Sequence, residues 1–450
     1  MVKTKLIFTL LAAGILISDI AIFPTVPGRA IAPASYYGPP ERGTFNYGIN
    51  TTYLYNYTYI LSRTTSGSYA SERWIPTLSN RTILSASGAL YEQEFKILNE
   101  TWTIPYTLGY YRLNDSYQNP MYYFDVSMPG TSSWRLNVMA NYTLREIAWQ
   151  TQTNVTMDSY NKTDGFYANY TRAELYINKS YPAIAANATL LNNSNPFTTA
   201  RNVYNWVSHF LTYQVQPTDN GAEWAMVHKV GDCTEFSYLM VALLRACGIP
   251  ARVLRGIVIA DSSLQGVTPD FRAAVGRKWT FATVLTNGEF TSDNSTGHAW
   301  LEYFIPGAGW ITADPTWNNA ADYAMRIDNI HVPYMAGVWI GSGISPAIPL
   351  DSEDVIYGVT TKLSSLPYPL WVGELGVKHE VYYKFTVIHQ EVTKTFLDNI
   401  IDFMTQNPLI ILGLLGVILL VIIIKFARRV KKSGKSGTND AYYRQRASFN

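Results

Sequence analysis

The distribution of apolar residues divides the 450-residue chain into regions of different periodicity. In the segment TTYLYNYTYILSR, residues 51–63, apolar and polar residues alternate, which is typical of a β-strand with one buried face. Between residues 198 and 215 apolar side chains recur at helical spacing, and the same spacing returns over 233–247, before Gly248 and Pro250. The sequence therefore predicts a β-rich N-terminal region followed by a region that contains helices.

Continuous apolar runs lie near both ends of the chain. At the N-terminus, residues 6–17 follow Lys3 and Lys5 and precede small residues around Ala30, which is the pattern of a secretory signal. We expect residues 1–34 to be a signal peptide or an uncleaved N-terminal anchor.

Near the C-terminus, residues 409–424 are apolar and uncharged. A helix of about nineteen residues reaches roughly 28 Å, close to the thickness of the hydrocarbon layer of a bilayer. We therefore predict a transmembrane helix over residues 405–427. The lysines and arginines that follow favour a cytoplasmic position for residues 428–450, with the bulk of the chain outside the cell membrane.

The formal net charge supports this division. It is +2 for the whole chain, +7 for residues 425–450 and +2 for residues 1–35, which leaves −7 for residues 36–424. The basic cluster belongs to the predicted membrane flank, so we expect the membrane as a partner and no nucleic acid.

Asn-x-Ser/Thr sequons also point to an extracellular location, because such sites can carry surface glycans. The candidate glycosylation sites are Asn50, Asn56, Asn80, Asn99, Asn114, Asn141, Asn154, Asn161, Asn169, Asn178, Asn187, Asn192 and Asn294. All but the last lie before residue 196, where β-forming tyrosines and threonines are also frequent. This combination predicts a glycosylated antiparallel β domain of the sandwich type over residues 35–195.

The two cysteines of the chain, Cys233 and Cys247, lie in the second predicted helix. Fourteen residues span about 21 Å along a helix, far more than the roughly 4.4–6.8 Å between Cα atoms that a disulfide allows. Cys247 falls on the apolar face and is interpreted as a small core residue. Cys233 follows Asp232 at the helix start, where Asp232 can cap the helix and the helix dipole favours a thiolate. Taken alone, Cys233 would be interpreted as an inert buried thiol.

Residues 296–318, TGHAWLEYFIPGAGWITADPTWN, predict two strands joined by a turn. His298 and Asp314 lie eight residues on either side of Pro306, so we expect them nearly opposite each other. Cross-strand neighbours have Cβ atoms within about 5 Å, close enough for a hydrogen bond between imidazole and carboxylate. A cysteine nucleophile needs such a base and such an orienting acceptor, which makes Cys233 a candidate nucleophile.

Three segments together resemble the transglutaminase-like superfamily, whose core is papain-like. They are GDCTEFSYLMVALLRACGIPARVLRG, GHAWLEYF and GWITADPTW, which begin at Gly231, Gly297 and Gly309. The resemblance covers about residues 197–330. It implies an α+β core in which the cysteine helix packs against an antiparallel sheet, with Cys233 as nucleophile, His298 as base and Asp314 as orienting carboxylate.

The expected fold class is therefore α+β. A transglutaminase-like core over residues 196–330 follows the N-terminal β-sandwich-type domain. An irregular and β-rich stalk region, the small C-terminal β region, is expected over 331–400, before the single transmembrane helix.

The resemblance implies a membrane-anchored extracellular enzyme that transfers the acyl group of an amide through a cysteine thioester. Transamidation, deamidation and peptide hydrolysis remain open, and the substrate is expected to be a protein or peptide at the cell envelope. Trp224 is the candidate second donor to the oxyanion, beside the Cys233 amide. Trp300 and Trp317 are expected to line the cleft, and Arg252 to be an ion-paired framework residue. The alternative is a catalytically silent scaffold or binding protein that retains the fold.

Metals and cofactors are not indicated. The six histidines lack the paired spacing of metal ligands, and we expect no metal and no cofactor. His228 and His331 could border the cleft.

Overall fold

The fold is taken from a computed structural model. It describes residues 42–85, 88–114, 119–174, 176–260, 272–293, 297–317, 322–337, 375–392 and 422–425. Met1–Glu391 form one unit, which contains a β-sandwich and an α+β core, and Val392–Asn450 belong to a second unit.

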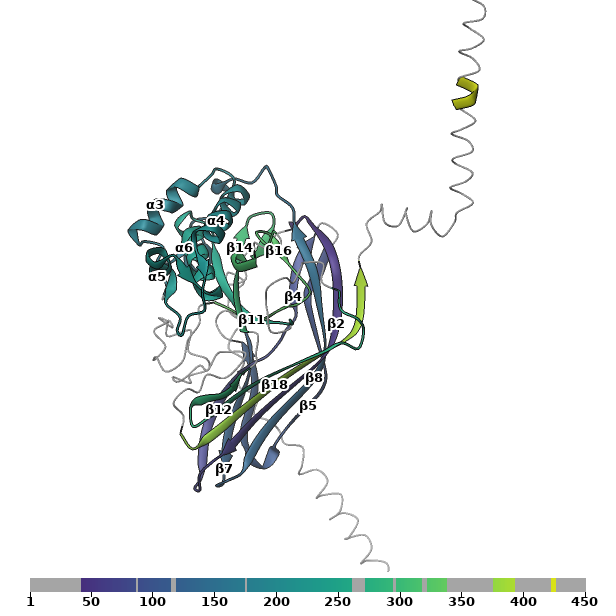
Figure 1. Cartoon of the computed structure of the whole chain (residues 1–450), viewed down its shortest axis with the longest axis vertical. Helices are drawn as coiled ribbons and strands as arrows, with labels where there is room; N and C mark the ends of the chain where they lie inside the picture. The colour runs from purple at the N-terminus through teal and green to yellow at the C-terminus, as the bar shows by residue number, and fades with distance from the viewer. Residues whose placement is uncertain are drawn as a thin grey trace, which may run out of the picture. The chain divides into compact units, whose positions relative to one another are not determined.

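The sandwich consists of a large and a small sheet (Figure 1). Its strands are β1 (Arg42–Gly43), β2 (Phe45–Arg63), β3 (Tyr69–Pro76), β4 (Arg81–Ser85), β5 (Gly88–Trp102), β6 (Thr107–Asn114), β7 (Pro120–Met128), β8 (Ser133–Trp149), β12 (Lys278–Thr286), β13 (Glu289–Asp293), β16 (Arg326–Ile327) and β18 (Val377–Val392). The large sheet has the order β1-β4-β5-β8-β2-β18-β12-β13, with β16 beside β8, and the small sheet has the order β3-β7-β6.

Strand β2 shows why the sandwich forms. Its side chains alternate between buried and half-buried positions, as the period of two predicts. The buried set consists of Ile49, Thr51, Tyr53, Tyr55, Tyr57, Tyr59 and Leu61. Phe124 of β7 packs edge-on against Trp134 of β8 with ring centroids 4.7 Å apart, so aromatic side chains fill the space between the two sheets.

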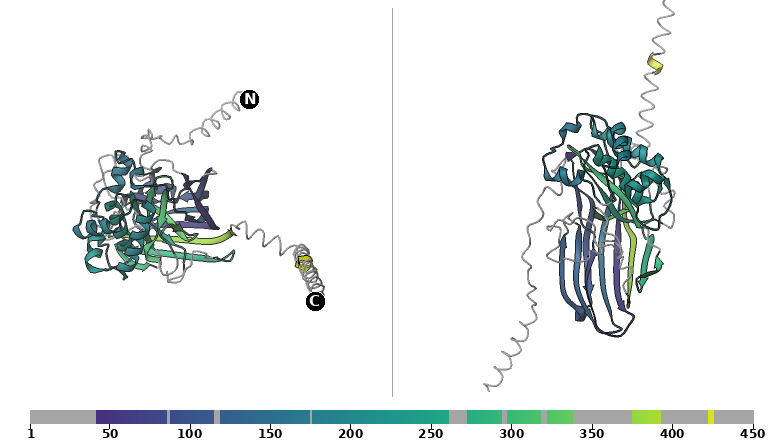
Figure 2. Two further views of the ribbon diagram at one scale, coloured as in Figure 1. Left: turned by 90° about the horizontal axis from the view of Figure 1, so that it is seen from above. Right: turned by 90° about the vertical axis from the view of Figure 1, so that its left-hand side faces the viewer.

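The core surrounds one helix, α6. Its elements are α2 (Gly165–Thr171), α3 (Pro182–Leu191), α4 (Pro196–Phe210), β9 (Thr212–Tyr213), α5 (Gly221–His228), β10 (Val230–Gly231), α6 (Cys233–Ala246), β11 (Ala251–Val258), β14 (Gly297–Ile305), β15 (Gly309–Ala313) and β17 (His331–Ala336). Short 3₁₀ turns are η2 (Ile104–Tyr106), η3 (Met157–Ser159) and η4 (Pro315–Trp317). The core sheet has the order β15-β14-β11-β17, and α6 packs against β14 and β11. Figure 1 and the right-hand view of Figure 2 show the helices together at one end of the long sandwich strands.

The chain divides differently from the predicted domain boundaries. Strand β17 pairs with β11 in the core sheet, and β18 lies between β2 and β12 in the sandwich, so these two strands do not belong to a stalk over 331–400. Helices α2 and α3, which precede residue 196, pack on α6 of the core. Strand β18 joins the large sheet because it buries alternate side chains. Its neighbours in that sheet, β2 and β12, come from distant parts of the sequence. The chain thus leaves the sandwich after β8 and returns to it three times, at β12 and β13, at β16 and at β18.

The predicted terminal segments fall largely outside the described residues. This applies to the signal over 1–34, the tail over 428–450 and the span over 405–427, of which only residues 422–425 are described, as helix. No helix among the described residues combines the length and apolar character needed to cross a membrane.

A buried ionic cluster joins the sandwich to the core. Arg81 of β4 donates to Glu302 of β14 at 2.5 Å, and Arg252 of β11 donates to the other oxygen of the same carboxylate. The Arg252 guanidinium also lies 4.2 Å from the Trp310 ring centroid, so Arg252 is the framework residue that the sequence predicted. Burial raises the pKa of Glu302, but the two guanidinium groups outweigh it and hold that pKa below its ordinary value.

We expect Glu302→Gln to lower the free energy of unfolding by about 3–5 kcal/mol, because the buried Arg252 guanidinium would lose its counter-ion, whereas Arg81 would retain Glu92 at 3.7 Å. Urea unfolding followed by tryptophan fluorescence measures this loss. Since folding depresses the Glu302 pKa, its contribution is present above pH ~4.3 and is lost as the pH falls through the folded-state value.

The matched control is Glu94→Gln, which removes the more exposed partner of Arg145 at 3.6 Å. Such a partly exposed pair contributes about 1 kcal/mol or less. Equal losses in the two variants would contradict the structural role of Glu302.

Candidate active site

Cys233 occupies the first position of α6, and the residues before it fix that position. Asp232 accepts a hydrogen bond from the Thr234 amide at 3.0 Å, and Glu235 accepts one from the Asp232 amide at 3.1 Å. This reciprocal capping box sets the start of the helix, so the predicted capping role of Asp232 is confirmed. A Cβ on Gly231 would lie 2.3 Å from that of Glu235, and glycine is therefore required there. Cys233 is half-buried at the positive end of the helix dipole.

His298 is the second residue of β14, and Asp314 directly follows β15. Their side chains are buried, and His298 Nε2 lies 2.7 Å from Asp314 Oδ2. The register pairs Leu301 with Ala313, so the two residues are diagonal neighbours and not directly opposite, as the spacing about Pro306 had suggested. The hairpin turns about Gly307, which has φ 79°, one residue later than assumed. Diagonal neighbours are about 7–8 Å apart at Cα, and the imidazole spans this separation.

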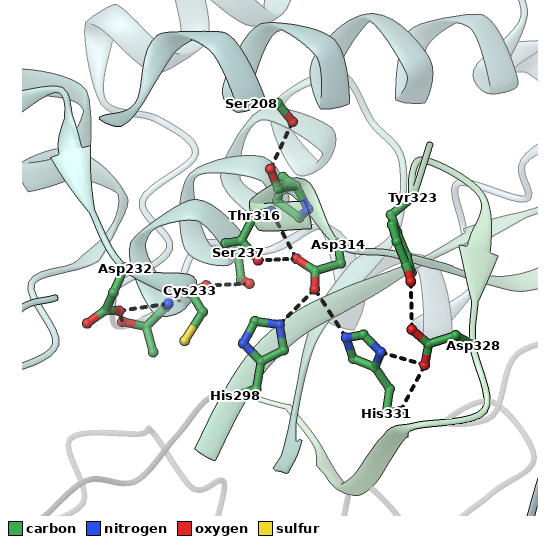
Figure 3. Close-up of polar contacts among 12 residues, drawn as sticks. Ser208, Asp232, Cys233, Ser237, His298, Asp314, Thr316, Tyr323, Asp328 and His331 are labelled. Atoms are coloured by element: carbon green, nitrogen blue, oxygen red, sulfur yellow. Dashed lines mark hydrogen bonds and ion pairs between the residues drawn. The ribbon is translucent and has the colours of Figure 1, made fainter. Parts of the chain in front are cut away.

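The Cys233 sulfur completes the arrangement. Figure 3 shows it directed toward His298, on the side of the ring that faces away from Asp314. Nδ1, the ring nitrogen on that side, is buried, and it has no hydrogen-bond partner of normal geometry among the described residues. The structure thus brings together the three residues that the sequence proposed, from α6, β14 and the end of β15.

His298 and Asp314 each shift the pKa of the other. Burial lowers the pKa of His298, but the negative charge of Asp314, the hydrogen bond to Asp314 and the neighbouring Cys233 sulfur outweigh it and raise the pKa to about 9. Burial raises the pKa of Asp314, yet His298 and His331 bring it well below its usual range. A protonated His298 hydrogen-bonded to an ionised Asp314 is therefore the favoured state of this pair at neutral pH.

Two tryptophans that were predicted to line the cleft hold the imidazole instead. The Trp300 and Trp317 ring centroids lie 5.7 and 5.9 Å from that of His298. Both tryptophans are buried, so they pack around His298 and do not form an open wall.

The predicted oxyanion donor Trp224 lies on α5. Its ring stacks on His228 with centroids 4.2 Å apart, and its oxyanion role remains a prediction. Tyr213, which the sequence did not single out, is closer to the chemistry. Tyr213 pairs in the β9–β10 ladder with Gly231, which lies two residues before Cys233 in sequence. The Tyr213 side chain is half-exposed. Burial and then the charge of Cys233 raise the Tyr213 pKa well above its ordinary value, so its hydroxyl remains a donor.

His331 is a further residue of the site that the sequence placed only at its border. Its Nε2 lies 3.2 Å from Asp314 Oδ2, and its Nδ1 lies 2.8 Å from Asp328 Oδ1 (Figure 3). The histidine is brought there because β17 pairs with β11. No local pattern around His331 reveals that pairing.

The donor atoms of His298, Asp314 and His331 lie within 4.8 Å of one another, so these residues could hold a metal ion. Two ligands of a tetrahedral metal at about 2.1 Å would be about 3.4 Å apart. The separations of 2.7 and 3.2 Å fit hydrogen bonds better. As arranged, the group is a hydrogen-bonded set.

Comparisons with known proteins agree with this site. Residues 184–315 match the sequence model of the transglutaminase-like superfamily. The uncharacterized protein YebA of Bacillus subtilis is 27% identical over 115 residues, which is 26% of this chain and 13% of that protein. A protein-glutamine gamma-glutamyltransferase of Pseudomonas aeruginosa is 28% identical over 116 residues, 25% of this chain and 14% of that protein. The aligned region thus spans about one seventh of the length of these curated relatives.

Among solved structures, a crystal structure of a candidate cysteine protease from Cytophaga hutchinsonii resembles the chain with a TM-score of 0.40 and 13% identity. The alignment covers 78% of this chain and 94% of that one. The family match contains Cys233, His298 and Asp314. The chain therefore contains a transglutaminase-like core over residues 184–315, which is less than half of its length.

Proposed function

We propose that this protein is a thiol-dependent enzyme that transfers the acyl group of a protein or peptide amide through a thioester on Cys233. The observation that carries the proposal is the side-chain arrangement. The Cys233 sulfur is directed at His298, whose far nitrogen lies 2.7 Å from the buried carboxylate of Asp314. A nucleophile, a base and a group that orients the base are the parts that acyl transfer requires.

In the first half of the reaction, the Cys233 thiolate attacks the carbonyl carbon and forms a C–S bond, while the carbonyl electrons move to oxygen. The C–N bond then breaks, and the proton on His298 Nδ1 goes to the departing amine. In the second half, His298 takes a proton from water or from an amine that attacks the thioester, and the thiolate is released. Asp314 keeps the ring in one orientation throughout.

The oxyanion of the tetrahedral intermediate needs donors. The Cys233 backbone N–H at the start of α6 is one. For the second, Tyr213 is better supported than Trp224, because the Cys233 charge acts on the Tyr213 hydroxyl, whereas the Trp224 ring is stacked on His228.

The acyl donor to be tested first is a glutamine carboxamide. Its support is the name of the Pseudomonas relative, a protein-glutamine gamma-glutamyltransferase, which the chain matches over 14% of that protein. Deamidation and peptide hydrolysis use the same thioester and differ only in the bond that breaks and in the acceptor. A silent scaffold that retains the fold remains the alternative.

The proposal extends to the location. We propose a glycosylated ectodomain that works outside the cell membrane and is anchored by the C-terminal apolar segment. The apolar run and its basic flank support the anchor, and the sequons support the exposure. None of the sequon asparagines whose side chains are described is buried.

We expect the purified full chain to modify a glutamine-containing peptide in the presence of a primary amine. Cys233→Ala should abolish the reaction, and Asp314→Asn should slow it by about 10³–10⁴-fold because the His298 ring loses its acceptor. Peptide mass spectrometry distinguishes a cross-link, a deamidation mass shift and new termini.

Cys247→Ala is the matched control, because Cys247 is buried, and burial raises the pKa of its thiol to about 12. It should retain full activity. Wild type and Cys233→Ala that were equally inactive on a broad peptide library would favour the silent scaffold.

We expect kcat/KM to fall as the pH rises through about 9. Folding raises the His298 pKa from about 6.5 to about 9, so the imidazolium persists through neutral pH and is lost only as the pH passes the folded-state value. A pH–rate profile of the full chain measures this limb. A decline centred near pH 6.5 would contradict the assigned His298–Asp314 pair.

We expect Tyr213→Phe to lower kcat by about 10²–10³-fold, the usual effect of removing one oxyanion donor. Trp224→Phe, which removes the indole N–H, should have the smaller effect. Steady-state kinetics with the same peptide compare the two variants, and the reverse order would restore Trp224 as the second donor.

A further inference from the structure

Asp314 has a second histidine neighbour, and the proposed reaction assigns that neighbour no role. His331 lies beside His298, and both histidines approach the same oxygen of Asp314, Oδ2, at 2.7 Å from His298 and 3.2 Å from His331 (Figure 3). We propose that His331 is a positioning residue, held as a permanent cation between Asp314 and Asp328, and that it sets the pH range in which the pair of Cys233 and His298 is ionised. This inference rests on the proposed function only in taking Cys233 as the nucleophile.

The first step is that Asp328 is ionised. Its Oδ1 accepts hydrogen bonds from the backbone amides of Ile330 and His331 at 3.0 and 2.9 Å. Its Oδ2 accepts one from the Tyr323 hydroxyl at 2.6 Å. A carboxylate that accepts several hydrogen bonds keeps its negative charge, and Asp328 is completely buried among these donors.

Asp314 is ionised for the same reason. Its Oδ1 accepts hydrogen bonds from the Thr316 amide at 2.9 Å and from the Thr316 hydroxyl at 2.5 Å. Both acceptors on either side of His331 are therefore anionic.

The second step concerns the His331 ring. Nδ1 faces Asp328 Oδ1 at 2.8 Å and Nε2 faces Asp314 Oδ2. A neutral imidazole has one N–H and one lone pair, so it would direct a lone pair at one of the two carboxylates. Only the imidazolium donates to both. Consistently, burial lowers the pKa of His331, but Asp328 and Asp314 outweigh it and raise the pKa to about 9.

The other groups that face His331 do not replace this charge. His298 of β14 lies with its ring centroid 5.4 Å away, and Trp300 and Trp317 pack on the remaining faces of the ring at 5.0 and 4.6 Å. Tyr323 lies 6.0 Å away and donates its proton to Asp328. Burial, together with the charge of Asp328, keeps it neutral.

Two tyrosines from other elements come under the same carboxylate charges. They are Tyr53 of β2, on which Asp328 acts, and Tyr204 of α4, on which Asp314 acts. Burial raises the pKa of each well above its ordinary value, so both remain neutral. The Asp328 charge also acts on Arg326, whose guanidinium is paired with Glu146. His331 is the cation that contacts both carboxylates directly.

The sandwich holds this cation in place. The Tyr53 hydroxyl of β2 donates to the Asn329 carbonyl oxygen at 2.9 Å, and the Asn329 side chain donates to Thr51 at 2.6 Å. Both contacts are made by Asn329, which follows Asp328 and precedes His331 in sequence. The loop that places the cation is therefore anchored on a strand outside the core.

A fixed positive charge at this position has a definite effect. It opposes a second positive charge on His298, and it favours the anionic form of every acid nearby. Removing it should shift the ionisation of the thiolate–imidazolium pair to higher pH. A structural role alone would lower stability without moving that pH range.

The test uses iodoacetamide alkylation of the full chain as a function of pH, with the Cys233 peptide followed by mass spectrometry. We expect His331→Gln to move the pH midpoint of Cys233 alkylation upward by about one pH unit. His379→Gln is the matched control, because His379 is also buried and hydrogen-bonded, to Tyr59 at 3.0 Å, but lies in the sandwich. It should leave the midpoint unchanged. An unchanged midpoint in a folded His331→Gln variant would overturn the proposal.

Nitrogen-15 NMR of the histidine rings gives a second readout that requires no variant at residue 331. The other five histidines can be assigned from their own substitutions, which leaves His331. We expect both of its ring nitrogens to carry protons at pH 7, and Asp328→Asn to bring its titration to lower pH. A His331 ring with one unprotonated nitrogen at pH 7 would exclude the permanent cation. Neither measurement needs a substrate, so an inactive enzyme with a cationic His331 would count against the proposed function alone.

Discussion

A carboxylate buried as completely as that of Asp314 keeps its charge only if donors and positive charge surround it, because burial without them would favour the neutral acid. Here the donors come from Thr316 and from two histidines. The site depends on this one anion. It fixes the orientation of the His298 ring, it makes the protonated ring the favoured form, and it leaves the opposite nitrogen directed toward Cys233.

The rest of the unit serves to keep that anion enclosed. Helix α6 supplies Cys233 from one side of the core sheet, and the hairpin of β14 and β15 supplies His298 and Asp314. The sandwich contributes through Glu302, which Arg81 of β4 and Arg252 of β11 share, and through the contacts of Tyr53 with the loop after Asp328. The sandwich therefore helps to position the site, although Cys233, His298 and Asp314 all belong to the core.

The same geometry limits the class of reaction more closely than it limits the acceptor. The proposed thioester would depend on the Cys233 sulfur, the His298 imidazole and the Asp314 carboxylate, whose positions the structure gives. Water and amine acceptors use that same set, and the groups that select between them belong to the substrate-facing surface. The proposed chemistry is accordingly acyl transfer from an amide, with the acceptor assigned by product analysis.

Local order in the sequence determined the parts of the site. Helical spacing and Asp232 place Cys233 at the start of a helix, alternation and a turn place His298 and Asp314 on paired strands, and period-two tyrosines form β2. These features depend on residues close together in the chain, so they are encoded in its local pattern. The exact register of the β14–β15 hairpin is not encoded in this local pattern. The turn centres on Gly307, and His298 and Asp314 are therefore diagonal neighbours.

Only the tertiary structure decided which distant segments meet. His331 reaches Asp314 because β17 pairs with β11, and β18 enters the sandwich beside β2, more than three hundred residues away in sequence. The pairing of such strands is selected by the burial of whole faces and by the closure of long loops, and no short stretch of sequence records it. The positions of Cys233, His298 and Asp314 were therefore predictable from the sequence, whereas the second histidine and the support from the sandwich were not.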